Sequence, residues 1–342
     1  MLIRTVARDN KPAFTRKNNM ENISQVHVGV DVSKGRLDVH IHPLEKHFSV
    51  ANSARGIEDL ISKLSIYEVQ RVVYESSGGY QKMLHRKLKE AKFKVWEVDP
   101  KRVKYFIASE GVKAKTDTID AKMIARFSAL KPQERKEIPL SDSADELRAL
   151  VKRRSDLVEM KATEKKRLVH PAQIHCTKKI KRHIRFLEKE IQEVEDDIEK
   201  IINKDKQLKK KCEILESMPG VGPKISQILV AEVPELGILQ NSQIASLIGV
   251  APYVNQSGNY KGVASIREGR PSPRKGVYMG ALSASHSKDN VFQRFFDRLI
   301  KKGKSAKVAL VALMRKMIVV SNALVRKNEF WNPHFQKSTQ IA

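Results

Sequence analysis

Apolar and polar residues alternate along the first third of the chain in the pattern of β-strands. The runs from Val26 to Asp31 and from Leu37 to Ile41 are rich in β-branched residues, and Ser33-Lys34-Gly35 supplies a turn between them. This pattern predicts a hairpin. The segments that follow predict a strand at His47–Val50, a helix at Ala54–Leu64, a strand at Arg71–Glu75, a helix ending near Ala91 and a strand at Lys94–Val98. Strands that come first and then alternate with helices predict a mixed α/β sheet.

From about Ser143 to Asp205 the pattern changes to long, charged helices. Apolar residues recur there in alternating steps of four and three, at Ile180, Ile184, Leu187, Ile191, Val194, Ile198 and Ile201. This spacing is typical of a coiled coil, and an ordinary amphipathic helix on a globular core is the alternative. His170 and Pro171 are expected to break the preceding helix. The segment is therefore either an antiparallel helical pair or an oligomerisation arm.

The fold class that these patterns predict is α/β plus α. We expect a disordered basic arm at 1–24, an α/β domain at 25–140, a coiled-coil or helical connector at 143–205, a mostly helical domain at 208–332 and a tail at 333–342. The most apolar run, Ala306 to Val325, is interrupted by Arg315 and Lys316, so we do not expect a membrane span.

The charge of the chain points to a polyanionic partner. The 342 residues include 65 Lys and Arg against 39 Asp and Glu, for a formal net charge of +26. Nucleic acid is the first candidate, because basic proteins gain affinity from the counterions released at neutralised phosphates. The only two cysteines, Cys176 and Cys212, exclude a site of several thiolates and indicate a reducing cytosol.

Four acidic residues stand where a metal site is expected. Asp31 and Glu75 each close a predicted strand, and ligands of α/β sheets gather at such strand ends. Asp117 and Asp120 open a predicted helix three residues apart, so that both project from one face. Converging carboxylates repel each other unless a cation binds, and hard oxygen ligands suit Mg²⁺, with Mn²⁺ as a substitute. The alternatives are a turn residue for Asp31, an exposed strand end for Glu75 and a helix cap for Asp117.

Basic residues and glycines mark further candidate nucleic-acid contacts. Lys113, Lys115 and Lys122 flank the last acidic pair, which favours the approach of a phosphate, although a solvated basic face is the alternative. Pro219-Gly220-Val221-Gly222 joins two apolar helical segments in the pattern of a helix-hairpin-helix, with Gly220, Gly222 and Lys224 as candidate phosphate contacts. A plain tight turn is the alternative.

Ser257 lies in a Gly-containing loop that is followed by a series of cations: Lys261, Arg267, Arg270, Arg274 and Lys275. A serine hydroxyl is a weak nucleophile that needs a base, a metal or a cationic field to assist it. The cations would stabilise a pentacovalent phosphate, although an ordinary loop serine is the alternative.

Taken together, several segments resemble one family, the bacterial insertion-sequence transposases with a DEDD active site, which include Piv-type invertases and RNA-guided recombinases. The segments are Gly29–Lys34, Tyr74–Gly78, Lys115–Ala121, Pro219–Gly222 and Gln256–Gly258, and the resemblance runs from about Val26 to Asn332. It implies a RuvC-like domain of the RNase H fold, a coiled-coil connector and a helical C-terminal transposase domain with a helix-hairpin-helix.

The resemblance also implies roles for individual residues. Asp31, Glu75, Asp117 and Asp120 would bind magnesium, and Ser257 would form a covalent phosphoserine link to DNA. Family members act as homo-oligomers, a dimer or tetramer here, and bind a structured noncoding guide RNA, so the expected setting is the bacterial cytoplasm at the nucleoid. Two features depart from the family: Glu268 stands where many relatives have a second glycine, and the arm before Met20 has no clear counterpart.

Three other functions stay open at this point. A metal-dependent DNA nuclease or junction resolvase would use the carboxylates alone, with Ser257 structural. A transposon relic would bind nucleic acid without catalysis. A sugar-kinase or actin-like ATPase also opens with a strand, an Asp and a hairpin, but the Gly that it would need two residues after Asp31 is Ser33 here.

Overall fold

The computed structural model describes residues 25–111, 116–131, 141–254, 256–258, 260–262, 264–288 and 290–333. The predicted arm at 1–24 and nearly all of the predicted tail lie outside these residues. The chain divides into two compact units, 1–134 and 135–342. Each is described below by itself.

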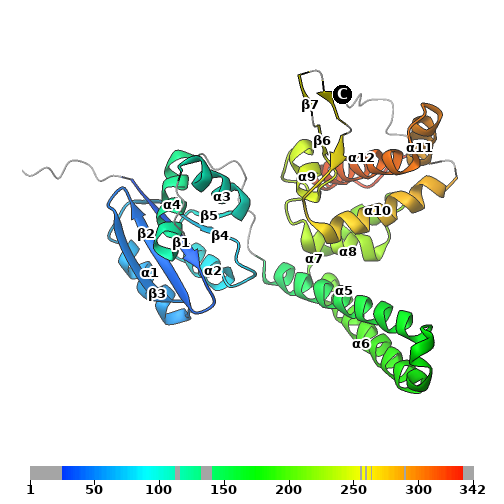
Figure 1. Cartoon of the computed structure of the whole chain (residues 1–342), viewed down its shortest axis with the longest axis horizontal. Coiled ribbons are helices and arrows are strands. Elements are labelled where there is room, and N and C mark those ends of the chain that lie inside the picture. Colours follow the sequence, from blue (N-terminus) through cyan, green and yellow to red (C-terminus); the bar gives the residue numbers. More distant parts are fainter. Residues whose placement is uncertain are drawn as a thin grey trace, which may run out of the picture. The chain divides into compact units, whose positions relative to one another are not determined.

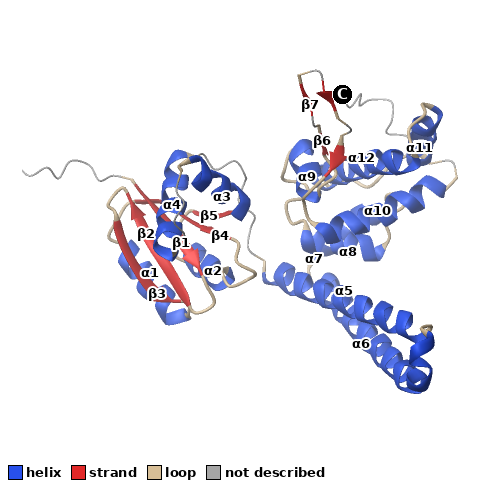
Figure 2. Cartoon of the chain, in the orientation of Figure 1, coloured by secondary structure: helices blue, strands red, loops and turns tan. Residues whose placement is uncertain are grey.

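The first unit is a five-stranded mixed sheet with helices on both faces (Figures 1 and 2). Its strands are β1 (Val26–Val32), β2 (Arg36–His42), β3 (Lys46–Ala51), β4 (Val69–Glu75) and β5 (Val95–Val98), in the order β3-β2-β1-β4-β5. The first three strands are antiparallel, whereas β4 runs parallel to β1 and β5 parallel to β4. All five predicted strands are confirmed to within two residues at each end.

One face of this sheet is covered by α1 (Ala54–Leu64) and α2 (Lys82–Glu90), which bury alternate residues such as Val28, Val30 and Tyr74. Ser53 caps α1 by accepting a hydrogen bond from the backbone of Gly56, so that the predicted helix is confirmed with its bounds.

The opposite face is covered by α3 (Pro100–Ser109) and α4 (Asp117–Leu130), which pack on Val73, Trp96 and Val98. Asp99 caps α3, and Pro100 occupies its first turn.

The second unit consists mainly of helices. Figure 1 shows α5 (Asp142–Leu168) and α6 (Thr177–Lys204) side by side as an antiparallel pair, joined through the 3₁₀ helix η1 (Pro171–Cys176). The heptad stripe of α6 faces α5, with Leu187 and Ile191 packed on Leu157. The predicted antiparallel pair is therefore confirmed, and an oligomerisation role of the same segment stays a prediction. Ile202 replaces Ile201 as the buried end of the stripe.

The described part of the second unit contains six further helices. They are α7 (Lys206–Glu216), α8 (Pro223–Glu232), α9 (Asn241–Ile248), α10 (Pro271–His286), α11 (Val291–Lys301) and α12 (Ala306–Lys327). Their core includes Leu147 and Val151 of α5 and Ile198 and Ile202 of α6, so the base of the helical pair belongs to the same core.

Among the described residues, α12 is long and apolar enough to cross a membrane by composition. It is a core helix of the second unit, packed against α7, α9, α10 and α11. Asn322, fully buried on α12, accepts a hydrogen bond from the backbone of Gly237 and donates to the carbonyl of Leu239. These hydrogen bonds hold α12 against the segment that joins α8 to α9.

Four two-residue strands, not predicted from the sequence, lie between α9 and α10. They are β6 (Pro252–Tyr253), β7 (Gln256–Ser257), β8 (Tyr260–Lys261) and β9 (Ser265–Ile266). β6 pairs with β9 and β7 pairs with β8, both antiparallel. They form a narrow ribbon that extends from the helical body beside α9 (Figure 2).

Candidate active site

Asp31 and Glu75 lie side by side because their strands are parallel neighbours. Val30 of β1 is in register with Tyr74 of β4, so the next residue on each strand is a carboxylate. Side chains alternate along a strand, which puts Glu75 on the same face as Val73, and Val73 packs under α4. Both carboxylates are half-buried at the carboxyl end of the two strands.

The helix α4 approaches β1 very closely on this same face. A Cβ added to Gly29 would lie 2.2 Å from the carbonyl oxygen of Ala121 and 2.4 Å from the backbone nitrogen of Ala125. At the other end of the contact, Nδ1 of His27 is 2.8 Å from Oγ of Ser128. The helix therefore runs antiparallel to β1, and its first turn continues past Gly29 toward Asp31.

This geometry explains how α4 contributes to the acidic end of the sheet. Asp117 and Asp120 stand in the first turn of α4, where the hydroxyl of Thr116 caps the helix by accepting from the backbone of Ile119 at 3.3 Å. Asp120 is half-buried, whereas the side chain of Asp117 lies outside the described residues. The fold brings Asp31, Glu75 and the start of α4 to one end of one sheet face.

Ser257 lies in the second unit, in the ribbon between α9 and α10. It pairs with Tyr260 across a two-residue connection that begins with Gly258 at φ +52°. Such positive φ values are typical of tight hairpin connections. Ser257 is exposed, so its hydroxyl is accessible to a large substrate.

The comparisons with known proteins identify the chain. A transposase model of the DEDD, IS110 type matches residues 28–175, and the model described as "Transposase IS116/IS110/IS902 family" matches residues 212–297. This chain is an IS110-type transposase. The transposase therefore acts on DNA as a recombination enzyme.

Relatives of the transposase include a pilin gene-inverting protein of Moraxella bovis, 26% identical over 315 residues, which cover 90% of this chain and 97% of the relative. The pilin gene-inverting protein of Moraxella lacunata matches to the same extent. An uncharacterised 43.6 kDa protein of insertion element IS110 from Streptomyces coelicolor is 27% identical over 131 residues, which cover 38% of this chain and 32% of that protein.

DEDD transposase domains typically depend on a divalent metal ion. The donor chemistry of Asp31, Glu75 and Asp120 fits such an ion, because all three are carboxylates at one end of the sheet. Within the part of the chain that the structure describes, however, no three acidic, histidine or cysteine side chains converge closely enough to hold a metal. The fourth predicted ligand, Asp117, is the one whose side chain is not described.

The predicted basic contacts of the transposase fall into three groups. Lys113 and Lys115, and the side chain of Lys261, lie outside the described residues. Arg267 and Lys275 are exposed. The remaining cations contact acidic or carbonyl groups of the protein: Lys224 pairs with Glu195, Arg274 donates to the carbonyl of Glu268, and Arg270 binds Glu235.

Gly220 and Gly222 differ in what surrounds them. Gly220 has φ +82°, and a Cβ there would be 2.4 Å from the carbonyl oxygen of Gly280 on α10. Gly222 has no atom within 4 Å of such a Cβ. Gly220 is thus required for the turn to pack on α10, whereas the position of Gly222 is open, as a phosphate contact would need.

Two residues next to the acidic end of the sheet were missed by the sequence reasoning. Asn52 and Gln81 bind the loops that follow Asp31 and Glu75. A single sequence offers no signal for them, because their hydrogen-bond partners are mostly backbone groups that any residue type carries.

Proposed function

We propose that this transposase cleaves and rejoins the DNA of a mobile element with two sets of residues, one from each unit. Asp31, Glu75, Asp117 and Asp120 would hold Mg²⁺, or Mn²⁺ in its place, in a RuvC-like domain of the RNase H fold. Ser257 would be the nucleophile. The observation that carries this proposal is the adjacent register of Asp31 and Glu75 with the first turn of α4 directed to the same end of the sheet.

The chemical step is an exchange of phosphodiester bonds. Oγ of Ser257 forms a bond to phosphorus, one phosphorus–oxygen bond to deoxyribose breaks, and the freed deoxyribose oxygen takes up a proton as the serine loses one. Rejoining reverses the step with a different deoxyribose hydroxyl. A divalent cation, when bound by the four carboxylates, would stabilise negative charge on the phosphate. Ser257 is exposed near the tip of a hairpin, which supports attack on a DNA duplex or junction, since such a substrate is too large for a deep pocket.

The decisive test is a covalent protein–DNA adduct. Purified protein is incubated with Mg²⁺, end-labelled element-junction DNA and co-purified RNA, and a denaturing gel is searched for a protease-sensitive adduct. We expect the adduct with wild type and with Ser265→Ala, an exposed serine of β9, but not with Ser257→Ala or Asp31→Asn. Cleavage that persists in Ser257→Ala without any adduct would instead favour a carboxylate-only nuclease or junction resolvase.

We also propose that an element-encoded, structured noncoding RNA guides the reaction at the bacterial nucleoid. The net charge of +26 supports the binding of two nucleic acids, because Lys and Arg that neutralise phosphates release condensed counterions. Treatment of the purified complex with ribonuclease should abolish adduct formation, and addition of the co-purified RNA should restore it. Adduct formation that is insensitive to ribonuclease contradicts the guide.

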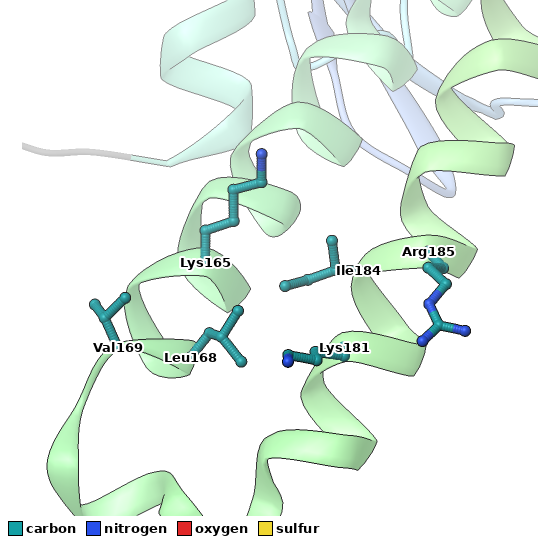
Figure 3. Close-up of a pocket in the computed structure, with 6 residues that line it drawn as sticks. All are labelled: Lys165, Leu168, Val169, Lys181, Ile184 and Arg185. Carbon is teal, nitrogen blue, oxygen red and sulfur yellow. The ribbon is translucent and has the colours of Figure 1, made fainter.

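Finally, we propose that the transposase works as a homo-oligomer, a dimer or tetramer. The far end of the helical pair supports this: a hollow there is lined by Lys165, Leu168, Val169, Lys181, Ile184 and Arg185 (Figure 3). Val169 is 80% exposed, and Phe186, which follows Arg185 on α6, is 56% exposed. Deleting α6 would also remove Ile198 from the core of the second unit and so destabilise the fold. The double variant Val169→Glu with Phe186→Glu tests the interface without this effect. We expect a lower oligomer mass by light scattering with an unchanged circular dichroism spectrum; an unchanged mass would refute this interface.

A further inference from the structure

Asn52 connects the two loops that follow the acidic strand ends. Its side-chain Nδ2 donates to the carbonyl oxygen of Ser33 at 2.8 Å and to that of Tyr80 at 3.1 Å. Ser33 is two residues beyond Asp31, and Tyr80 is in the loop that begins after Glu75. One amide group thus bridges the β1–β2 turn and the β4–α2 loop.

The backbone of Asn52 is itself fixed on the sheet. Its N–H donates to the carbonyl oxygen of Gly35 at 3.0 Å, and Ala51 before it is in register with Arg36 at the end of β3. The following residue, Ser53, caps α1. Asn52 therefore reaches the β4–α2 loop from a backbone that is held on β3 and on the β1–β2 turn.

The loop after Glu75 is held from its other side by Gln81. Oε1 of this buried residue accepts from the backbone N–H groups of Ser77 at 3.2 Å and Gly79 at 3.0 Å, while its Nε2 donates to Glu97 of β5 at 3.0 Å. Gly79 has φ +108°, which glycine adopts readily, and the contacts of Gln81 add to the backbone hydrogen bond from Tyr80 to Ser77 at 3.2 Å in holding the loop. A change in the contact of Asn52 with this loop would therefore also displace the end of β4.

The bridge requires the chemistry of an amide. A side-chain amide supplies two N–H donors from one nitrogen, and both are accepted here by carbonyl oxygens. An aspartate at the same place would set a carboxylate against two carbonyl oxygens, and an alanine would leave both of them without this donor. A serine would supply a single donor.

We propose that Asn52 is a positioning residue that sets the separation of Asp31 and Glu75, and thereby the affinity of the acidic site for its divalent cation. This inference rests on the proposed function. Mg²⁺ demands near-ideal octahedral geometry, so a small displacement of one ligand weakens binding. Outer groups that orient metal ligands are typically responsible for about 10- to 100-fold in metal affinity or activity.

The test compares Asn52→Ala and Asn52→Ser with Ser53→Ala, which weakens the cap of α1 but leaves both loop contacts intact. In the full-length protein without DNA, Mn²⁺ affinity is measured by electron paramagnetic resonance, and unfolding by thermal denaturation. We expect Asn52→Ala to raise the Kd for Mn²⁺ and the half-saturating Mg²⁺ concentration for cleavage about 10-fold. Asn52→Ser should fall between it and wild type, and the cleavage rate at saturating Mg²⁺ should be largely retained.

The outcomes separate this inference from the proposed function. A purely structural role of Asn52 predicts a lower Tm with no shift in the Mn²⁺ Kd, as for Ser53→Ala, and that result would overturn the positioning role alone. Wild-type protein that binds no Mn²⁺, with cleavage unaffected by Asp31→Asn, would overturn the carboxylate site and the positioning role together. If Asn52→Ala does not fold, Asn52→Ser decides by the same criteria.

Discussion

A structural role and a DNA-binding role of Arg270 can be distinguished by experiment. The sequence predicts a phosphate contact, but in the structure the two terminal nitrogens of Arg270 each donate to Glu235, at 2.6 Å. One of them also donates to the carbonyl of Glu232 at 2.7 Å. The side chain of Glu235 is only 7% exposed, so its carboxylate relies on this guanidinium. We therefore expect Arg270→Ala to act mainly on stability.

The magnitude follows from the burial of the pair. Removing one partner of a buried ion pair costs about 3–5 kcal/mol, because the other charge is left uncompensated. The side chain of Arg270 is 35% exposed, so water would reach part of the vacated space, and we expect the lower end, about 3 kcal/mol. In a unit of this size 1 kcal/mol corresponds to about 2–4 °C, which gives a fall in Tm of about 6–12 °C.

The assay pairs thermal denaturation with DNA binding at several salt concentrations. Arg267→Ala is the matched control, because Arg267 is an exposed neighbour that donates a hydrogen bond to the hydroxyl of Ser265 at 3.4 Å. A double-mutant cycle with Glu235→Gln should show a coupling energy of about 1–3 kcal/mol. The reasoning is refuted if Arg270→Ala keeps the wild-type Tm while the slope of log K against log salt decreases by about 0.9, the value for one lost phosphate contact.

Three further predictions test other parts of the structure. Gly220→Ala should lower the free energy of unfolding by about 2–5 kcal/mol, because Gly220 has a positive φ and the added Cβ would collide with the carbonyl oxygen of Gly280. Gly222→Ala should change it by no more than about 0.5 kcal/mol, and equal effects in denaturant unfolding would contradict this packing. Glu268→Gly should stabilise the protein by about 0.5–1 kcal/mol because Glu268 has φ +57°, and a loss of stability would contradict this. Burial lowers the pKa of His40 below 6.5, so the unfolded state takes up a proton that the folded state does not. The free energy of unfolding should therefore fall by up to about 1.4 kcal/mol per pH unit below pH 6.5. In Tm measurements at several pH values, His40→Phe should flatten this dependence, and an unchanged slope would rule out His40 as its source.

The sequence predicted the parts of the fold that local patterns determine. Alternating valines predicted β1, and the apolar pattern predicted α1 with its bounds; the structure adds that Ser53 caps this helix. The helix α3 was missed because only Val103 and Phe106 are buried in it, too few to produce a clear period. The heptads of α6 predicted a helical partner, but a period does not reveal whether that partner is the same chain or another copy.

Long-range pairs were beyond the reach of the sequence for a different reason. Arg270 and Glu235 are 35 residues apart, and nothing local distinguishes a cation that binds a buried carboxylate from one that binds phosphate. The departure at Glu268, in contrast, was visible in the sequence, and its positive φ explains why a glycine would suit that position.

The motif Gly29-Val30-Asp31 combines a local strand pattern with a long-range contact to α4. Val30 is buried on the α1–α2 face, and Gly29 admits α4 to the opposite face, where any Cβ would collide with its backbone. Because α4 starts with Asp117 and Asp120, the missing side chain at Gly29 determines how near those acids come to Asp31. The glycine is thus as necessary to the acidic end of the sheet as the carboxylates, although it carries no chemistry of its own.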